Sequence, residues 1–344
     1  MISNLSKTAK LLLTSVCIIM LAEFYPNVPI PAQAAPGTDI FQWVDWSTNI
    51  PNIDTQLLGS IQVRGNRIWL TSDIQGALFY SQDSGETFHQ ASANRSPGPR
   101  GIYMAQNGNL GWGVGQANVF RTDDGGVTWV GKYIQASLEA VHFPTDQIGY
   151  AVGNTVSTTS DGGQNWEKKT FPKQYVTLAA VFFPNPSNPD FGYVGVANSD
   201  PSLYITTDGG DSWTPVNLGE LGGGINSIDF ISPDRGWAAG FGGKIYAYTY
   251  GTWTRLNSDI TVNLNSISFS PGGVCGCAAG ESGTLLCTQD GGSHWQLEAA
   301  GMTNEVLTGV DVVSCLEAYA VGYRVFLRAK IDLPNNTYIP LIIR

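Results

Sequence analysis

Charged residues are scarce in this sequence of 344 residues: they make up 13% of it, and 28 acidic against 18 basic residues give a net charge of −10. Such an acidic balance disfavours nucleic acid or an anionic membrane surface as the main partner. The 3 histidines, His89, His142 and His294, lie far apart in the chain and lack the spacing of metal ligands. We therefore interpret them as surface or core residues.

Catalytic motifs are missing as well. The sequence contains no Gly-x-Ser-x-Gly, no His-Glu-x-x-His and no phosphate-binding loop. We expect a protein that is not an enzyme and that holds neither a metal nor a cofactor.

Long apolar runs are also lacking. The run Leu11–Ala22 is too short to span a bilayer, but it follows Lys7 and Lys10 and precedes small residues at Ala32 and Ala34. This order is typical of a secretory signal peptide over residues 1–34, and it predicts export to a periplasmic, lumenal or extracellular compartment. Lipidation of Cys17 is disfavoured, because a residue smaller than valine usually precedes a lipidated cysteine.

One short pattern is abundant. It reads TSDGGQNW at residues 159–166 and returns with variations at residues 81–88, 122–129, 206–213 and 288–295. An acid followed by glycines is turn chemistry, because the carboxylate accepts nearby backbone N–H groups and glycine tolerates positive φ. The acids of these boxes are therefore expected to be structural rather than catalytic or calcium-binding; they are Asp83, Asp124, Asp161, Asp208 and Asp290.

The boxes recur about every forty residues, which is the period of a propeller blade with four strands. Their closing aromatics are Phe88, Trp129, Trp166, Trp213, Trp253 and Trp295. A second motif, Gly-aromatic-Ala-Val-Gly at residues 149–153, repeats in phase with them. Six windows fit between Trp46 and Trp295, and the remnants at the two ends complement each other. We predict an all-β, seven-bladed β-propeller over residues 35–332, closed by Phe41–Trp46 pairing with Val325–Ala329, and followed by a tail at residues 333–344.

Four cysteines follow the predicted signal peptide: Cys275, Cys277, Cys287 and Cys315. An even number in an exported chain favours disulfides over a metal site. Cys277 and Cys287 flank a predicted hairpin turn, and Cys275 and Cys315 fall in equivalent loops of neighbouring repeats. We expect up to two disulfides, and a bridge between Cys275 and Cys315 would join the two blades beside the closure.

The boxes resemble the Asp-box, or BNR repeat, of sialidases, sortilin-type receptors and photosystem II assembly factors. Over the whole mature chain, the signal peptide, the seven predicted blades and the two phased motifs resemble the photosystem II stability/assembly factor family. This resemblance implies a monomeric, non-enzymatic scaffold that binds membrane-protein assembly intermediates, with a role in photosynthesis. Family members present an arginine-rich surface to the partner, whereas arginine is sparse in this acidic chain.

The alternative function is a sialidase-like or carbohydrate-binding propeller. Sialidases carry an Arg-Ile-Pro motif in the first blade, and here the corresponding region, residues 64–69, reads RGNRIW without proline. A shared fold does not carry a shared site, so we favour the scaffold.

Nine of the 18 basic residues are expected on one face, in loops that enter each blade or join its second and third strands. Loops on a rigid scaffold often bind partners, and such a local field can steer an acidic peptide or a membrane-protein loop. The alternative, a solvated surface with scattered lysines, stays open. The nine residues are Arg95, Arg100, Lys132, Lys168, Lys169, Lys173, Lys244, Arg255 and Arg324.

Overall fold

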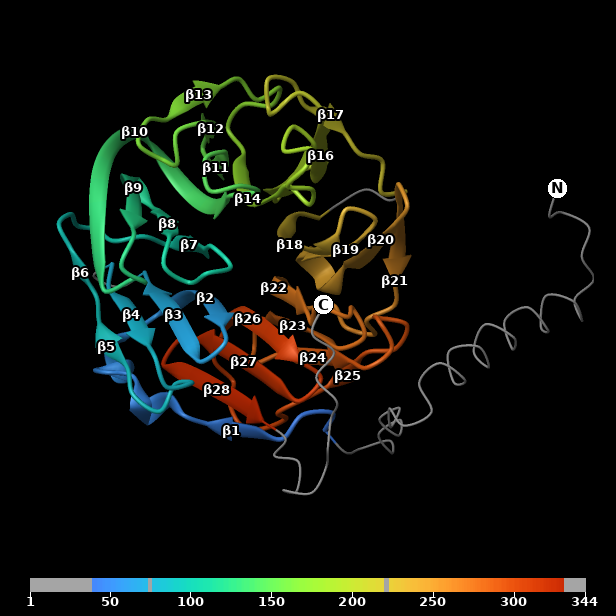
Figure 1. Cartoon of the computed structure of the whole chain (residues 1–344). Coiled ribbons are helices and arrows are strands. Elements are labelled where there is room, and N and C mark those ends of the chain that lie inside the picture. Colours follow the sequence, from blue (N-terminus) through green and yellow to red (C-terminus); the bar gives the residue numbers. More distant parts are fainter. Residues whose placement is uncertain (1–38, 74–75, 220–222, 331–344) are drawn as a thin grey trace, which may run out of the picture. The chain divides into compact units, whose positions relative to one another are not determined.

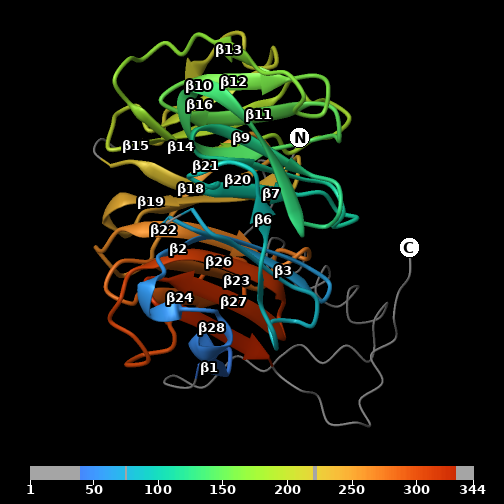
Figure 2. The ribbon, with the colours of Figure 1, turned by 90° about the vertical axis from the view of Figure 1, so that its left-hand side faces the viewer.

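The computed structural model describes residues 39–73, 76–219 and 223–330, and it confirms the seven-bladed β-propeller. Among the described residues the strands form six sheets and seven blades, because blades two and three share β10. The blades are arranged in a ring (Figure 1), and their innermost strands line a central channel. Figure 2 shows the strands of successive blades layered along the edge of the ring. The predicted signal peptide and C-terminal tail lie outside the described residues.

Each blade takes its innermost strand from the start of its repeat. The innermost strands are β2 (Leu58–Arg64), β7 (Gly101–Met104), the end of β10 (Thr128–His142), β14 (Thr177–Phe182), β18 (Ile225–Ser232), β22 (Leu264–Phe269) and β26 (Leu307–Ser314). The second strands are β3 (Arg67–Ser72), β8 (Gly111–Val114), β11 (Gly149–Gly153), β15 (Gly192–Ala197), β19 (Arg235–Gly240), β23 (Gly276–Gly280) and β27 (Glu317–Gly322).

Except in blade two, the two outer strands of a blade are together shorter than the two inner ones. The third strands are β4 (Leu78–Ser81), β9 (Gln116–Thr122), β12 (Val156–Thr159), β16 (Leu203–Thr206), β20 (Ile245–Thr249), β24 (Leu285–Thr288) and β28 (Val325–Lys330). The outermost strands are β5 (His89–Gln90), the start of β10, β13 (Glu167–Lys169), β17 (Thr214–Pro215), β21 (Thr252–Leu256), β25 (Gln296–Leu297) and β1 (Trp43–Asp45). Three single turns of 3-10 helix complete the fold: η1 (Ser47–Asn49), η2 (Ile53–Thr55) and η3 (Phe241–Gly243).

Aromatic pairs fill the spaces between blades. A ring on the second strand of one blade stacks on a Phe of the next innermost strand, because both side chains point into the shared interface. The ring centroids are 3.7 Å apart for Trp112 and Phe143, and 3.5 Å apart for Trp237 and Phe269. The second motif of the sequence therefore supplies the core between blades, where stacked rings bury large apolar areas.

The box turns are closed by their own aspartates. In the box of Asp124, one carboxylate oxygen accepts the Thr122 hydroxyl at 2.8 Å and the Thr128 N–H at 3.0 Å, and the other accepts the Thr128 hydroxyl at 2.6 Å. The same set of bonds surrounds the other four box aspartates. Hydrogen bonds from the residue four positions later lower the pKa of Asp83, Asp161 and Asp208 to about 2.

The two glycines of the box in blade two lie against Trp69 of blade one. The indole N–H of Trp69 in blade one donates to the carbonyl of Gly125 at 2.7 Å, and that of Trp129 donates to the carbonyl of Gly126 at 3.0 Å. Gly126 has φ +87°, and a Cβ there would lie 2.4 Å from the Trp69 nitrogen. Trp112 and Trp237 contact the first box glycine of the next blade in the same way. The boxes of blades two, three and six therefore bind the preceding blade through an indole hydrogen bond, and we call this contact a clasp.

The predicted ring closure is confirmed. Strand β1 pairs antiparallel with β28, with Trp43 opposite Ala329 and Asp45 opposite Leu327 (Figure 1). The buried carboxylate of Glu298 in blade six accepts the N–H of Phe41 at 3.0 Å and the indole N–H of Trp43 at 3.3 Å. The N-terminal segment thus completes blade seven and is also bonded to blade six.

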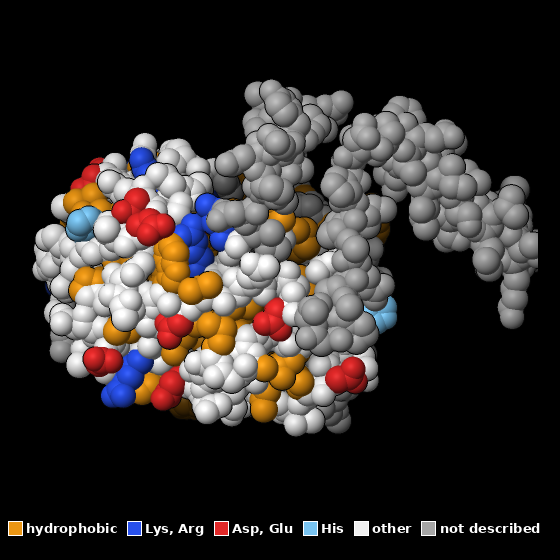
Figure 3. Space-filling model, turned by 90° about the horizontal axis from the view of Figure 1, so that it is seen from below, with side chains coloured by type: hydrophobic (Ala, Val, Ile, Leu, Met, Phe, Trp, Pro, Cys, Tyr) orange, Lys and Arg blue, Asp and Glu red, His pale blue; other side chains and the backbone are white. Residues whose placement is uncertain are grey.

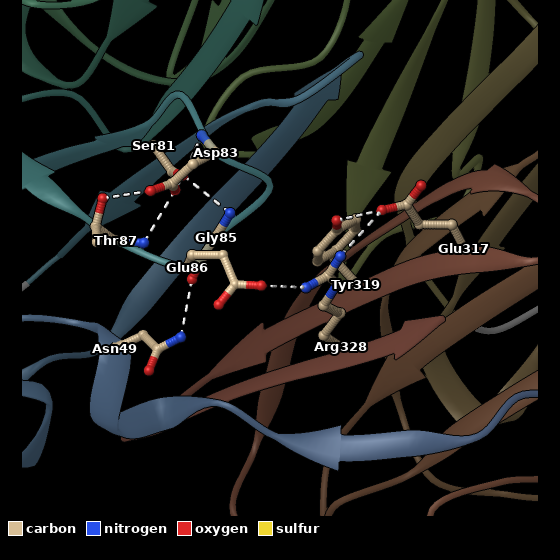
Figure 4. A network of polar contacts seen from close by, with 9 residues as sticks. All are labelled: Asn49, Ser81, Asp83, Gly85, Glu86, Thr87, Glu317, Tyr319 and Arg328. Atoms are coloured by element: carbon tan, nitrogen blue, oxygen red, sulfur yellow. Dashed lines mark hydrogen bonds and ion pairs between the residues drawn. The ribbon is translucent and has the colours of Figure 1, made fainter. Parts of the chain in front are cut away.

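A buried cation also holds this closure. The Arg328 guanidinium lies 4.1 Å from the centroid of the Trp46 ring. Its nitrogens are 3.6 Å from Glu86 and 3.8 Å from Glu317 (Figure 4). Asn49 donates to the carbonyl of Gly85 at 2.9 Å, so the segment after β1 contacts the box of blade one. The closing segment therefore contacts both sides of the seam between the two ends of the described chain.

The junction of blades two and three is formed by a single strand. Strand β10 is continuous: its start pairs with β9 as the outer strand of blade two, and its end pairs with β11 as the inner strand of blade three. The segment His89–Arg100, which joins blades one and two, contains β5 and also β6 (Ser92–Ala93), which pairs with the outer edge of β10. Backbone groups along the long outer edge of β10 attract this additional strand.

Both cysteine pairs form disulfides. Cys275 is bonded to Cys315, with their Cα atoms 5.2 Å apart, and this bridge joins blades six and seven. Cys277 is bonded to Cys287, directly opposite it in the ladder between β23 and β24. Among the described residues, no group of His, Cys, Asp or Glu has the arrangement of a metal site, and no helix is long and apolar enough to cross a membrane.

Candidate binding site

The ring has two faces that the strand order defines. The chain enters each innermost strand at one face, where the turns between second and third strands also lie; we call it the entry face. The turns between first and second strands and the box turns lie at the opposite face, which we call the box face. Because binding residues of a propeller concentrate in such loops, the face on which each basic residue lies indicates where a partner can bind.

Five of the nine basic residues lie in loops of the entry face. Arg95 is exposed and donates to the carbonyl of Gly131 at 3.0 Å. Lys173 donates to the carbonyl of Asp200. Arg324 is exposed in the turn between β27 and β28, and its guanidinium lies 4.6 Å from the centroid of the Tyr323 ring. The other two are Arg100, before β7, and Lys244, before β20.

Four of the nine lie in outermost strands, so placing them in loops was wrong. Lys132 is in β10, and its ammonium donates to Gln164 and Asn165 of the box in blade three at 2.7 and 2.9 Å. Lys169 is in β13 and forms an ion pair with Asp211 of the box in blade four at 2.8 Å. Lys168 donates to the carbonyl of Gln135, and Arg255 in β21 donates to the carbonyl of Leu256 at 2.7 Å. Strand β13, which holds Lys168 and Lys169, has only 3 residues and therefore offers little sequence signal.

A small cavity opens at the entry end of the channel. Its volume is about 230 Å³, and Gly59, Arg100, Glu139, Asn265 and Thr308 contribute to its wall. Arg100 forms an ion pair with Glu139 at 3.0 Å and lies 3.8 Å from Asp73. Burial raises the pKa of both carboxyl groups, and the Arg100 charge opposes this shift. The cavity therefore offers a fixed guanidinium and small side chains, which suits a polar chain end or loop.

Seven residues that face the channel were not predicted from the sequence. Each occupies the same register position, opposite the second-strand residue of the Gly-aromatic motif. We call this set the channel belt; its members are Gln62, Tyr103, His142, Phe182, Asp229, Ser268 and Asp311. The residue type differs in each blade, so no repeated letter marked the position. The recurring signal was a single residue between two apolar ones near the end of each innermost strand.

Belt side chains bond each blade to the next. Asp229 accepts the N–H of Phe269 at 2.7 Å, and Asp311 accepts the N–H of Val63 at 2.7 Å. Gln62, His142 and Ser268 accept the equivalent N–H, which always follows the belt residue of the next blade. Tyr103 and Phe182 make ring contacts instead: the Tyr103 centroid is 4.8 Å from that of His142, and the His142 centroid is 4.2 Å from that of Phe182.

The oxygen atoms of the box carboxylates are occupied within their turns, which argues against a catalytic role. Each is hydrogen-bonded inside its own turn, and although burial opposes this effect, the hydrogen bonds lower the pKa of all five. Of the histidines, His294 contacts Asp290 at 2.6 Å as part of a box, and His142 belongs to the channel belt. On the edge of the ring seen in Figure 3, acidic side chains are dispersed among neutral and apolar ones.

Two characterised sequences are similar to the chain, and no family model matches it. It is 24% identical over 209 residues to the photosystem II assembly lipoprotein Ycf48 of a Synechococcus species, which covers 56% of the chain and 60% of that protein. It is 23% identical over 286 residues to a probable oligoxyloglucan-reducing end-specific xyloglucanase of Neosartorya fischeri, which covers 69% of the chain and 31% of that protein. The chain thus spans less than two thirds of either relative.

Solved structures agree on the propeller. The structure of YCF48 bound to D1 peptide superposes with a TM-score of 0.66 at 19% identity, over 87% of the chain and 99% of that structure. YCF48 from Cyanidioschyzon merolae gives a TM-score of 0.64 at 16% identity, over 84% and 98%. A xyloglucanase of Xanthomonas campestris gives 0.68 at 15% identity, but the match covers only 52% of that structure. In sequence and in fold, the chain is therefore similar to the photosystem II assembly factors of the Ycf48 type.

Proposed function

We propose that the chain is an exported, non-catalytic scaffold that binds a peptide segment of a membrane protein during assembly, and that this segment docks on the entry face. The observation that carries the proposal is similarity to Ycf48 over nearly the whole length of a structure that is bound to D1 peptide. The mature chain would begin near residue 35, and the two disulfides support an oxidising compartment.

The entry face fits an acidic or carboxylate-bearing peptide better than the box face does. Arg95, Lys173 and Arg324 project from its loops, and Arg100 lines the cavity at its centre. Lys132 and Lys169 contribute less, because their charges bond to box turns of the next blade. Basic loops around a cavity give steering and orientation, although the whole molecule is acidic.

Charge reversal tests this proposal with a matched control. In one variant Lys173 and Arg324 are changed to Glu, and in the other Lys132 and Lys169 are changed to Glu, so that the net charge changes equally. Binding of a fluorescent D1 peptide, measured by anisotropy, should weaken at least about tenfold in the first variant only. Equal loss in both variants would show nonspecific electrostatics, and undiminished binding by the first would refute the entry face.

A second candidate function is glycan binding or hydrolysis, which the similarity to xyloglucanases favours. Incubation of the protein with xyloglucan oligosaccharides, followed by a reducing-end assay, tests this function. Turnover by the unmodified protein would replace the scaffold proposal, since the box aspartates are bound within their turns and other acids would then have to act.

A further inference from the structure

The box-face end of the channel contains a second, larger cavity. Its volume is about 510 Å³, and all seven innermost strands contribute to its wall. Gly65, Gln106 and Pro271, in turns between first and second strands, place it at the box face. It is therefore distinct from the small entry-face cavity at Arg100, and the proposed docking of a peptide does not use it.

The channel belt divides the wall of this cavity into two arcs. Tyr103, His142 and Phe182 form an aromatic arc with Phe230, whose centroid is 5.6 Å from that of Phe182. The remaining belt residues, Asp229, Ser268, Asp311 and Gln62, form a polar arc. Asp229 and Asp311 each use Oδ2 to accept a backbone N–H. The Phe230 N–H also interacts with the Asp229 carboxylate, whereas no second hydrogen bond to Asp311 occurs among the described residues.

Arg64 is the one basic side chain among the described residues that line the cavity. Burial raises the pKa of Tyr103, Asp229 and Asp311 and lowers that of His142. The Arg64 charge opposes the rise in the first three and adds to the fall in His142, so it acts on groups from four different blades. Its hydrogen bonds go to the Val63 carbonyl at 2.7 Å and to Gln62 at 3.4 Å, both on its own strand. Arg64 is thus held along the wall and leaves the carboxylate oxygens uncovered.

The charges of the groups that line the cavity indicate which kind of ligand it can bind. Two carboxylates face one guanidinium, and the other titratable belt groups, Tyr103 and His142, are neutral, because burial lowers the pKa of His142 to about 3 and raises that of Tyr103. Strands β14 and β22 contribute the uncharged Phe182 and Ser268. When both carboxyl groups are ionised, the cavity carries one excess negative charge beside an aromatic wall, and a cation gains from both features.

We propose that the box-face end of the channel binds one organic cation, a guanidinium or ammonium group on an aliphatic chain, as an arginine or lysine side chain presents it. The cation contacts Oδ1 of Asp311 and the carboxylate of Asp229, and it packs against the aromatic arc. Without the cation, burial raises the pKa of Asp229 to about 7 and that of Asp311 to about 6, so one carboxyl group is protonated near neutrality. Binding therefore releases a proton and strengthens as the pH rises from 5 to 8.

The test uses the full chain and isothermal titration with N-acetyl-argininamide, and the matched neutral probe is the citrulline analogue. Asp229→Asn and Asp311→Asn retain an oxygen that accepts the Phe269 or Val63 N–H, so the blades stay bonded while the charge is lost. We expect each variant to bind argininamide at least about tenfold more weakly, whereas Arg64→Gln binds it several-fold more tightly. Asp259→Asn, an exposed acid outside the channel, is the control and should bind as the unmodified protein does.

Several outcomes would overturn the proposal. These are no argininamide binding by the unmodified protein, equal binding of the citrulline analogue, or weaker binding by Arg64→Gln, which would indicate an anion or a neutral sugar. Thermal unfolding of each variant shows whether the ring is intact. The Glu variants at Lys173 and Arg324 should bind argininamide normally, so a failed entry face and a failed channel site give different results.

Discussion

Trp69 and Gly125 are 56 residues apart in the sequence, yet the indole N–H of the first lies 2.7 Å from the carbonyl of the second. This bond joins blade one to the box of blade two and is buried. Trp69→Phe removes the donor and leaves a buried carbonyl with one partner fewer, so we expect a loss of about 1–2 kcal/mol in the free energy of unfolding. Trp295→Phe is the matched control, because the Trp295 nitrogen is buried without a hydrogen-bond partner. Equal losses in urea unfolding of the two variants would contradict the clasp.

The box aspartates should matter for stability alone. Asp124→Ala removes three hydrogen bonds that close one turn, and we expect a loss of about 1 kcal/mol, as for other turn caps. The measurement is urea unfolding together with D1 peptide binding by the same sample. Lost binding at unchanged stability would show that the boxes are functional instead.

The closing segment should be essential to the ring. Deletion of residues 39–46 exposes the edge of β28, removes the N–H partners of the buried Glu298 and removes the Trp46 ring that covers the buried Arg328. We expect a sharp fall in the melting temperature and a tendency to associate through the open edge. Calorimetry and light scattering measure both effects. An unchanged melting curve would mean that blade seven is stable with three strands.

The bridge between Cys275 and Cys315 should stabilise more than the bridge between Cys277 and Cys287. The first closes a separation of 40 residues and the second one of 10, and loop-closure entropy gives roughly 4 against 2.7 kcal/mol. Double Cys→Ser variants of each pair, compared by guanidinium unfolding, test the order. A larger loss from the second pair would show that native packing, rather than chain entropy, dominates.

Stability should be greatest in mildly acidic solution. The raised pKa values of Asp229, about 7, and Asp311, about 6, mean that the folded chain holds protons more tightly than the unfolded chain. Their stabilisation is complete below about pH 4 and is lost as the pH rises through 6 to 7. The box aspartates with pKa values of about 2 act oppositely, and their contribution is lost as the pH falls from about 4 to 2. We expect a maximum near pH 4–5 in unfolding experiments, with a flatter decline above it in Asp229→Asn.

The ring and its closure were predictable because they depend on residues that repeat. The boxes and the Gly-aromatic motif recur in phase, and the remnants around Trp46 and Val325 match only if the ends meet. The channel belt could not be found this way, because each blade uses a different side chain to accept the same N–H. Gln62, His142 and Asp229 each supply a hydrogen-bond acceptor at the same register position. Because the residue type differs, this shared role does not appear as a repeated residue in the sequence.

The basic residues show a second limit of the sequence. We assigned Lys132 and Lys169 to loops, but they lie in the outermost strands β10 and β13. In the structure their charges bond to boxes of the next blade, which depends on the angle between blades. Such contacts between repeats follow from the curvature of the ring and have no counterpart within a single repeat.

The continuous strand β10 makes blades two and three one mechanical unit. In the other blades a separate connection lies between the outer strand of one blade and the inner strand of the next, so the chain can be cut there while each sheet keeps its strands. A break within residues 134–137 would instead divide a single strand and release an edge in two sheets at once. New chain ends for circular permutation therefore belong in the other linkers. A fragment that ends after blade two would end within β10, so its outer strand would lack the part that pairs with β11.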